Sequence, residues 1–228
     1  MVQISGFGNI SSAGSVVGVM RILSVAAGAT LFACNLVSFA QSEVACGQTL
    51  DAPLRSRAVL TIDSRPAGLE VVGTDQEMIH VSCAADDADS ARHIRLQFSG
   101  TATDARLKIT GAYLKHGNLR IRIEVPRKVS LGIRMPAGEV KVEEIAGDKD
   151  IDLYAGQITI SSTQEWNYRN VNASVDIGAV NAPVYGANKG GFFRSVTRRA
   201  VGGEYRLHAH VMTGEIDLRG RSPHSNSD

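Results

Sequence analysis

The 228-residue sequence lacks the features that define several protein classes. Its three cysteines are too few for a disulfide-dense mini-scaffold or a four-cysteine zinc site. Its six prolines and 23 glycines are too few and too scattered for a collagen-like or low-complexity chain. Lysine and arginine total 24 and aspartate and glutamate 23, so the net charge of +1 creates no global basic field for nucleic acid. We therefore expect a globular protein that binds no nucleic acid.

Short motifs of enzyme chemistry are also missing. The sequence has no Gly-x-Ser-x-Gly nucleophile motif, no His-Glu-x-x-His zinc motif and no glycine-rich loop of the phosphate-binding type. We therefore predict a protein that is not an enzyme and that uses no cofactor or metal.

The first 40 residues differ from the rest, because they contain no acidic residue and one basic residue, Arg21. The apolar run over 22–34 has the length of a signal-peptide hydrophobic region and is too short to cross a bilayer of roughly 30 Å as a helix. Ser38 and Ala40 place small residues at −3 and −1 before Gln41, which is the pattern that signal peptidase recognises. This predicts a signal peptide over 1–40 and export to the periplasm, the outer surface or the medium.

Two alternatives concern details of this leader. Met20, directly before Arg21, is a second candidate start beside Met1. A lipoprotein signal, with Cys34 as the lipid acceptor, is the other alternative to a soluble exported chain.

Cleavage after residue 40 would leave two cysteines, Cys46 and Cys83, and a net charge of zero. In an oxidising compartment an even pair of cysteines most simply forms a disulfide. Closing a loop of this length stabilises by about 3–4 kcal/mol in the chain-entropy model. We predict a Cys46–Cys83 disulfide, with a reactive thiol as the alternative.

Alternation of apolar and polar residues predicts β-strands over most of the remaining chain. It is clear over 59–62, 94–98, 119–125 and 129–135, where valine and isoleucine are frequent. Glycine, proline and asparagine lie between these runs and predict turns there, including one at 136–138. The chain is predicted to be all-β.

A short pattern of small residue, glycine, polar residue and alternating aliphatic residues repeats along the chain. It occurs at 137–142, 155–160, 177–182 and 213–218, with an earlier copy offset by one residue at 67–72. A unit of 18 residues accommodates two strands and two turns. This favours stacked β-coils, a solenoid-like fold of the single-stranded β-helix type with a strand-rich N-terminal part, over a β-sandwich.

In such coils the aliphatic members of each copy would line one interior. The interior set would be Val140, Val142, Ile158, Ile160, Ile216 and Leu218. The alternating polar members, Glu139, Lys141, Gln157, Thr159, Glu215 and Asp217, would face water.

These segments resemble the putative-adhesin, β-strand-repeat domains of bacterial exported proteins. The similarity lies in the copies at 137–147 and 155–160, in the proline-containing turn before them at 125–131, and in the strand pair over 62–75. It spans about 57–219 and departs from the family pattern at 171–193, where Gly-Asp-Ile becomes Gly-Ala-Val. The resemblance implies stacked β-coils and carries over no catalytic residue.

Three groups of residues are candidates for a site. His208 and His210 share one face of a predicted strand, a spacing that can chelate a metal. A third ligand would have to come from the fold, and Glu204 and His116 are candidates that the sequence does not place; solvent-facing histidines are the simpler interpretation. Asp150, Asp152 and Asp176 are the carboxylates that a polysaccharide hydrolase or lyase would have to align. The third group is a basic and aromatic cluster that could bind a polyanion or a sugar acid, or simply be solvated: Lys189, Phe192, Phe193, Arg194, Arg198, Arg199, Tyr205 and Arg206.

These observations predict a signal peptide over 1–40, an N-terminal segment over 41–56, an adhesin-like β-repeat domain over 57–219 and a disordered polar tail over 220–228. The predicted function is non-catalytic: a surface for a protein or polysaccharide at the bacterial cell envelope, with Arg194, Arg198, Arg199 and Tyr205 as the ligand surface. A polysaccharide hydrolase or lyase acting along a β-solenoid groove is the alternative.

Overall fold

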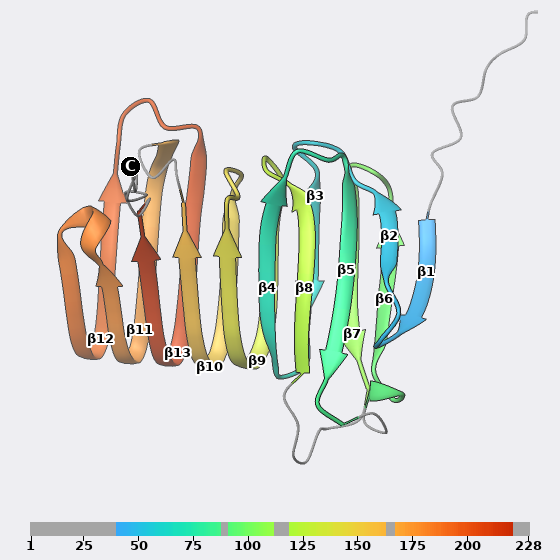
Figure 1. Cartoon of the computed structure of the whole chain (residues 1–228). Helices are drawn as coiled ribbons and strands as arrows, with labels where there is room; N and C mark the ends of the chain where they lie inside the picture. Colours follow the sequence, from blue (N-terminus) through green and yellow to red (C-terminus); the bar gives the residue numbers. More distant parts are fainter. Residues whose placement is uncertain (1–39, 88–90, 112–118, 163–166, 221–228) are drawn as a thin grey trace, which may run out of the picture. The chain divides into compact units, whose positions relative to one another are not determined.

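A computed structural model of the chain describes residues 40–87, 91–111, 119–162 and 167–220 (Figure 1). The signal peptide predicted over 1–40 and the polar tail predicted over 220–228 lie outside the described residues, apart from Ala40 and Gly220. All of the described residues belong to one unit, Val37–Asp228. Within the described part of the chain, no helix is long and apolar enough to span a membrane.

The fold is all-β, and its strands form one sheet that is not closed. The described residues form thirteen strands: β1 (Ala40–Ala45), β2 (Leu50–Pro53), β3 (Val59–Asp63), β4 (Ala67–Thr74), β5 (Met78–Ala85), β6 (Arg95–Gly100), β7 (Asp104–Thr110), β8 (Leu119–Pro126), β9 (Ser130–Glu143), β10 (Lys149–Ser161), β11 (Tyr168–Ala182), β12 (Ala187–Arg199) and β13 (Tyr205–Arg219). A single-turn 3-10 helix, η2 (Pro183–Tyr185), joins β11 to β12.

Strand β9 joins two parts of this sheet. Its first half pairs with β3, as in Ser130 opposite Val59, and its second half pairs with β4, as in Gly138 opposite Ala67. From β3 the sheet continues through β7 and β6 to β1, and from β4 it continues through β8 and β5 to β2. Figure 1 shows β4, β8 and β5 in front of β3, β7 and β6.

The four long strands β9, β10, β13 and β11 run parallel and in register, with β12 antiparallel at the outer edge. The glycines of the repeats fall in one row across these strands, because Gly156 pairs with both Gly138 and Gly214, and Gly214 pairs with Gly178. Spatial order departs from chain order, since the last copy of the repeat, in β13, lies between the second and the third.

The structure corrects the expected layout of one repeat. Two strands and two turns per unit were predicted, with a turn at 136–138, but the copies at 137–142, 155–160, 177–182 and 213–218 each lie within a single strand of 13 to 15 residues, and Figure 1 shows these strands bent. The reason is conformational: Gly156 has a φ of +129°, which lets the strand change direction without ending its ladder of partners.

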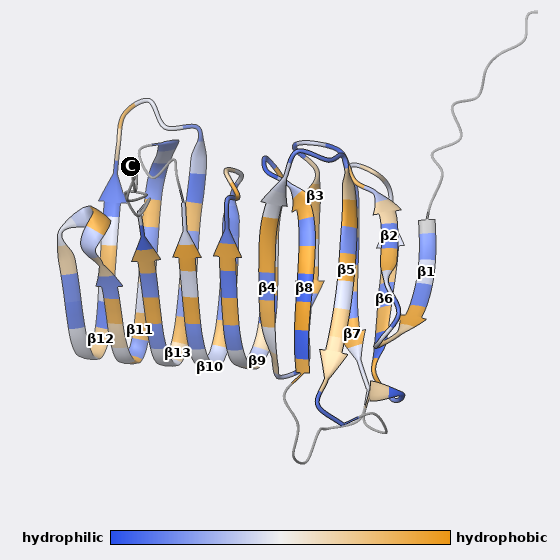
Figure 2. Cartoon of the chain, in the orientation of Figure 1, coloured by the Kyte–Doolittle hydropathy of each residue, from blue (hydrophilic) through white to orange (hydrophobic). Residues whose placement is uncertain are grey.

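The interior predicted for the repeats is confirmed. The six aliphatic residues assigned to it are all buried, and they lie in one continuous core with the apolar residues of the N-terminal strands. Bands of alternating hydropathy along the strands in Figure 2 show the period of two that produced the prediction.

The water-facing set of the repeats is wrong at two positions, since Thr159 is 4% exposed and Asp217 is 8% exposed. These residues are Cα partners on neighbouring strands. The Asp217 carboxylate accepts hydrogen bonds from Gln157 at 2.8 Å and from Asn181 at 3.0 Å. Side chains on adjacent parallel strands are close enough to cover one another, so an outward position is buried here by its neighbours.

The predicted disulfide is present: Cys46 and Cys83 are bonded, with their Cα atoms 5.0 Å apart. The segment 41–56 belongs to the same sheet as the rest of the chain, because β1 pairs with β6 and β2 pairs with β5. The disulfide therefore links the loop between β1 and β2 to strand β5.

Lys149 is a buried lysine that the sequence did not reveal. It is 2% exposed and occupies an inward position between Leu131 and Leu207 of the flanking strands. Its ammonium group donates hydrogen bonds to the carbonyl oxygens of Ile145 at 2.7 Å and Gly147 at 3.2 Å, and it contacts the hydroxyl of Tyr168. Burial lowers the pKa of Lys149 to about 7 and raises that of Tyr168.

Candidate functional site

A cluster of aspartates and histidines lies on the outer face of strands β10, β13 and β11. Asp150 and Asp152 are the outward residues of β10, and their Cα partners on β13 are His208 and His210. The inward residues between them, such as Ile151 and Ala209, are fully buried. The period of two therefore sends the two carboxylates and the two imidazoles to the same side of the sheet.

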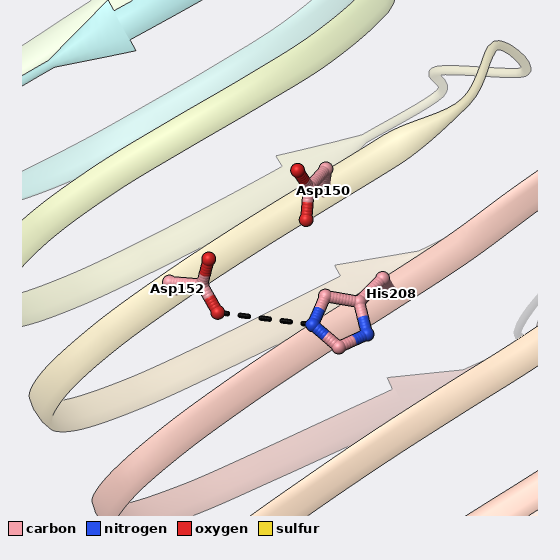
Figure 3. A group of neighbouring side chains, drawn as sticks. All are labelled: Asp150, Asp152 and His208. Atoms are coloured by element: carbon pink, nitrogen blue, oxygen red, sulfur yellow. Dashed lines mark ion pairs between the residues drawn. The ribbon is translucent and has the colours of Figure 1, made fainter.

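Arg134 of β9 holds one oxygen of each carboxylate. Its Nη2 lies 2.6 Å from Oδ2 of Asp150, and its Nε lies 3.0 Å from Oδ2 of Asp152. The other oxygen of Asp152, Oδ1, lies 3.8 Å from Nε2 of His208 and 3.8 Å from Nδ1 of His210. Figure 3 shows the Asp152 carboxylate and the His208 imidazole directed at one another, with Asp150 beside them.

His210 lies between two carboxylates. While Nδ1 faces Asp152, Nε2 lies 3.5 Å from Oδ1 of Asp176 on β11. A neutral imidazole that donates from Nε2 to Asp176 presents the lone pair of Nδ1 to Asp152.

The structure thus unites two predicted groups that the sequence kept apart, the histidine pair and the aspartates. The ligand atoms of Asp150, Asp152 and His208 lie within 4.8 Å of one another, a spacing that could hold a metal ion. Glu204, considered from the sequence as a further metal ligand, instead pairs with Arg57 at 3.4 Å. His116, considered for the same role, lies outside the described residues.

Exposed large apolar side chains lie on β10, β13 and β11 and on the adjacent strand β12. Ile177 of β11 has Thr213 of β13 and Phe192 of β12 as its Cα partners. These exposed residues are Tyr154 of β10, Met212 of β13, Ile177 of β11, and Phe192 and Phe193 of β12, and we call them the apolar ridge. Phe192 and Phe193 are 67% and 81% exposed, and Phe193 has a φ of +50°, a region that aromatic residues seldom occupy.

The edge strand β12 carries the basic residues predicted as a ligand surface. Its 13 residues include Lys189, Arg194, Arg198 and Arg199 and no acidic residue. Arg194, Arg198 and Arg199 are exposed on this strand, and the guanidinium of Arg198 lies 5.1 Å from the ring centre of Tyr185.

Tyr205, the fourth member of the predicted ligand surface, lies elsewhere. It is 8% exposed at the start of β13, and its ring centre is 6.4 Å from that of Tyr168. The alternation of β13 places Tyr205 on the inward side with Leu207 and Ala209, so its ring packs in the core and not beside the three arginines.

No family model matches the chain, and no curated protein matches it in sequence. Among solved structures, the chain is similar to a putative cell adhesion protein from Clostridium sporogenes, with a TM-score of 0.51 at 12% identity over 76% of this chain and 99% of that one. A putative lipid binding protein from Parabacteroides distasonis aligns with a TM-score of 0.21 at 9% identity, over 77% of this chain and 96% of that one. The first of these similarities concerns the fold alone.

Proposed function

We propose that this protein is a non-catalytic, exported β-repeat protein that presents a binding or adhesion surface at the bacterial cell envelope. The observation that carries the proposal is the apolar ridge, whose two phenylalanines lie on the basic strand β12. Soluble proteins seldom expose several large apolar side chains on adjacent strands, and where they do, the group is commonly an interaction site. The strained φ of Phe193 supports the same interpretation. The Phe193 ring is exposed, so packing in the core does not compensate this strain.

Two further features support this assignment. The Cys46–Cys83 disulfide suits an oxidising compartment, as expected for a chain with the predicted signal peptide. The similarity in fold to the cell adhesion protein from Clostridium sporogenes agrees with the resemblance of residues 57–219 to adhesin-like repeats. The partner would be a protein or a polysaccharide of the cell surface.

We infer that β9, β10, β13 and β11 are successive coils of a β-solenoid-like stack within this open sheet. Each strand pairs in parallel and in register on both sides of its glycine, as in Ile151 opposite Ile133 and Ile158 opposite Val140. In a coil stack each strand contributes to two faces, whereas in a sandwich each strand belongs to one sheet.

The proposal is tested by measuring adhesion of the protein to bacterial envelope preparations. Beads coated with the protein should adhere to bacterial envelope preparations, and the double variant Phe192→Ser/Phe193→Ser should lose most of this adhesion. Val201→Ser is the control, because Val201 is an even more exposed apolar residue that lies away from the ridge in the turn before β13. Equal adhesion by both variants and the wild type would assign the contact to another surface.

The enzymatic alternative has its own test. A glycosidase needs two carboxylates about 5–10 Å apart, one of them able to donate a proton. Asp150 and Asp152 instead share Arg134 as their ion-pair partner. We expect no release of reducing ends from envelope polysaccharides. Release that disappears in Asp152→Asn would replace the binding proposal by the hydrolase.

A further inference from the structure

We propose that Asp150, Asp152, His208 and His210 form a binding site for a divalent transition-metal cation of the zinc type. The two residue pairs come from adjacent parallel strands, and each aspartate is the Cα partner of a histidine. Imidazole and carboxylate ligands together suit Zn²⁺ and its neighbours in the first transition row, whereas Ca²⁺ and Mg²⁺ prefer oxygen ligands alone.

Asp150, Asp152 and His208 have ligand atoms within 4.8 Å of one another, and His210 adds a contact to Asp152 alone among these three. Zn–N and Zn–O bonds of about 2.0–2.2 Å in a tetrahedron place two ligand atoms about 3.3 Å apart. Oδ1 of Asp152 is 3.8 Å from one nitrogen of each histidine. Small side-chain rotations would therefore close the site, while the strands that carry the ligands stay paired.

The orientation of the ligands also points to a cation. Arg134 occupies only the Oδ2 atoms of the two aspartates, so the Oδ1 atom of Asp152 is directed at the imidazoles. Asp176 can accept the Nε2 proton of His210, which turns the Nδ1 lone pair toward Asp152. A second carboxylate that fixes the tautomer of a histidine ligand is common at metal sites. With this tautomer, two electron-pair donors face each other and would attract a cation between them.

The test starts from the tag-free full chain, from which metals are removed with EDTA. The chain is then titrated with zinc chloride, and isothermal titration calorimetry measures the binding. Every sample carries Cys34→Ser, so that this thiol does not bind zinc. We expect one Zn²⁺ per chain, and no saturation by Ca²⁺ or Mg²⁺ at the concentrations at which Zn²⁺ saturates the site. Thermal unfolding measured in parallel should shift upward with Zn²⁺, because a ligand that binds only the folded state stabilises it.

Variants separate this site from other histidines. His208→Gln and Asp152→Asn should each weaken zinc binding at least about tenfold, since each removes one ligand. His80→Gln is the matched control: His80 also pairs with an aspartate, Asp51, but lies on β5 away from the cluster, and zinc binding should be unchanged. Circular dichroism of each variant verifies that it is folded.

Arg134→Met provides a result of opposite sign. This change removes a positive charge and frees both Oδ2 atoms, so zinc should bind more tightly than to the wild type. Absence of saturable zinc binding, or binding that His208→Gln and Asp152→Asn leave intact, would overturn the proposal. In that case the side chains of the cluster interact with one another and hold no metal. Because the assay contains no envelope partner, its failure would leave the proposed adhesion function standing.

Discussion

Alanine in place of Gly156 probes the bend on which the parallel strands depend. Gly156 has a φ of +129°, and a Cβ atom at this position would lie 1.9 Å from the carbonyl oxygen of Gly138 on the adjacent strand. Side-chain carbons do not approach backbone oxygen so closely, so one of the two strands would have to move.

Two contributions set the size of the effect. Forcing a residue with a Cβ into this region of φ costs about 1–3 kcal/mol, and relieving the overlap with Gly138 adds about 1–3 kcal/mol, as in overpacked cores. We expect Gly156→Ala to lower the free energy of unfolding by about 2–6 kcal/mol. That is a large part of the 5–15 kcal/mol typical of a domain.

Gly202→Ala separates the two contributions. Gly202 also has a positive φ, +91°, but no atom lies within 4 Å of the position of an added Cβ. This variant should lose only about 1–2 kcal/mol. Urea denaturation followed by far-UV circular dichroism gives both values. If the two variants differ by less than about 0.5 kcal/mol, close packing of the glycine row is not what the bend requires.

Four further variants test the core, the disulfide and the buried lysine. Ile158→Asp should lower the free energy of unfolding by more than about 3 kcal/mol, because it buries an unpaired carboxylate. Thr159→Asp should lower it by about 1–2 kcal/mol, since this buried position has Asp217 as its neighbour. Urea denaturation measures both values, and a Thr159→Asp variant as stable as the wild type would contradict the burial of Thr159. Replacing Cys46 and Cys83 by serine opens a loop with a sequence separation of 37 and should lower the free energy of unfolding by about 4 kcal/mol. In the exported wild-type protein, alkylation and mass spectrometry without reductant should find no free thiol at either position. Because the folded-state pKa of Lys149 is lowered to about 7, the unfolded chain holds more protons between about pH 7 and pH 10, so the free energy of unfolding should rise with pH across this window. Lys149→Met should flatten this rise when urea denaturation is repeated across the window, and an unchanged slope would show that Lys149 is not its source.

Local patterns in the sequence predicted much of the fold. Alternating aliphatic residues identified the interior of the repeats, from Val140 to Leu218, because a strand sends successive side chains to opposite faces whatever its partner is. The glycines of the repeats marked the bends, since few other residues adopt their φ. The cysteine count predicted the disulfide, because only two cysteines follow the predicted leader.

The order of the strands was decided by the tertiary structure alone. The repeat of β13 comes last in the chain yet pairs with β10 and β11, and nothing in its own residues names these neighbours. This pairing sets His208 and His210 beside Asp150 and Asp152, which lie more than 50 positions earlier in the sequence. Alternation could place each residue on the outer face, but the cluster depends on which strands are adjacent.

The sequence also did not predict which outward-facing and strand-end side chains are buried. Thr159 and Asp217 alternate as surface residues should, yet both are buried: Asp217 accepts hydrogen bonds from Gln157 and Asn181 of the two adjacent strands, and Thr159 is its Cα partner on β10. A lysine is normally solvated, but the register of Lys149 against Leu131 and Leu207 directs it inward, where backbone carbonyls receive its ammonium group. The sequence determined which residues can form the faces of these strands, and long-range pairing determined which faces are covered, because register joins segments that are far apart in the chain.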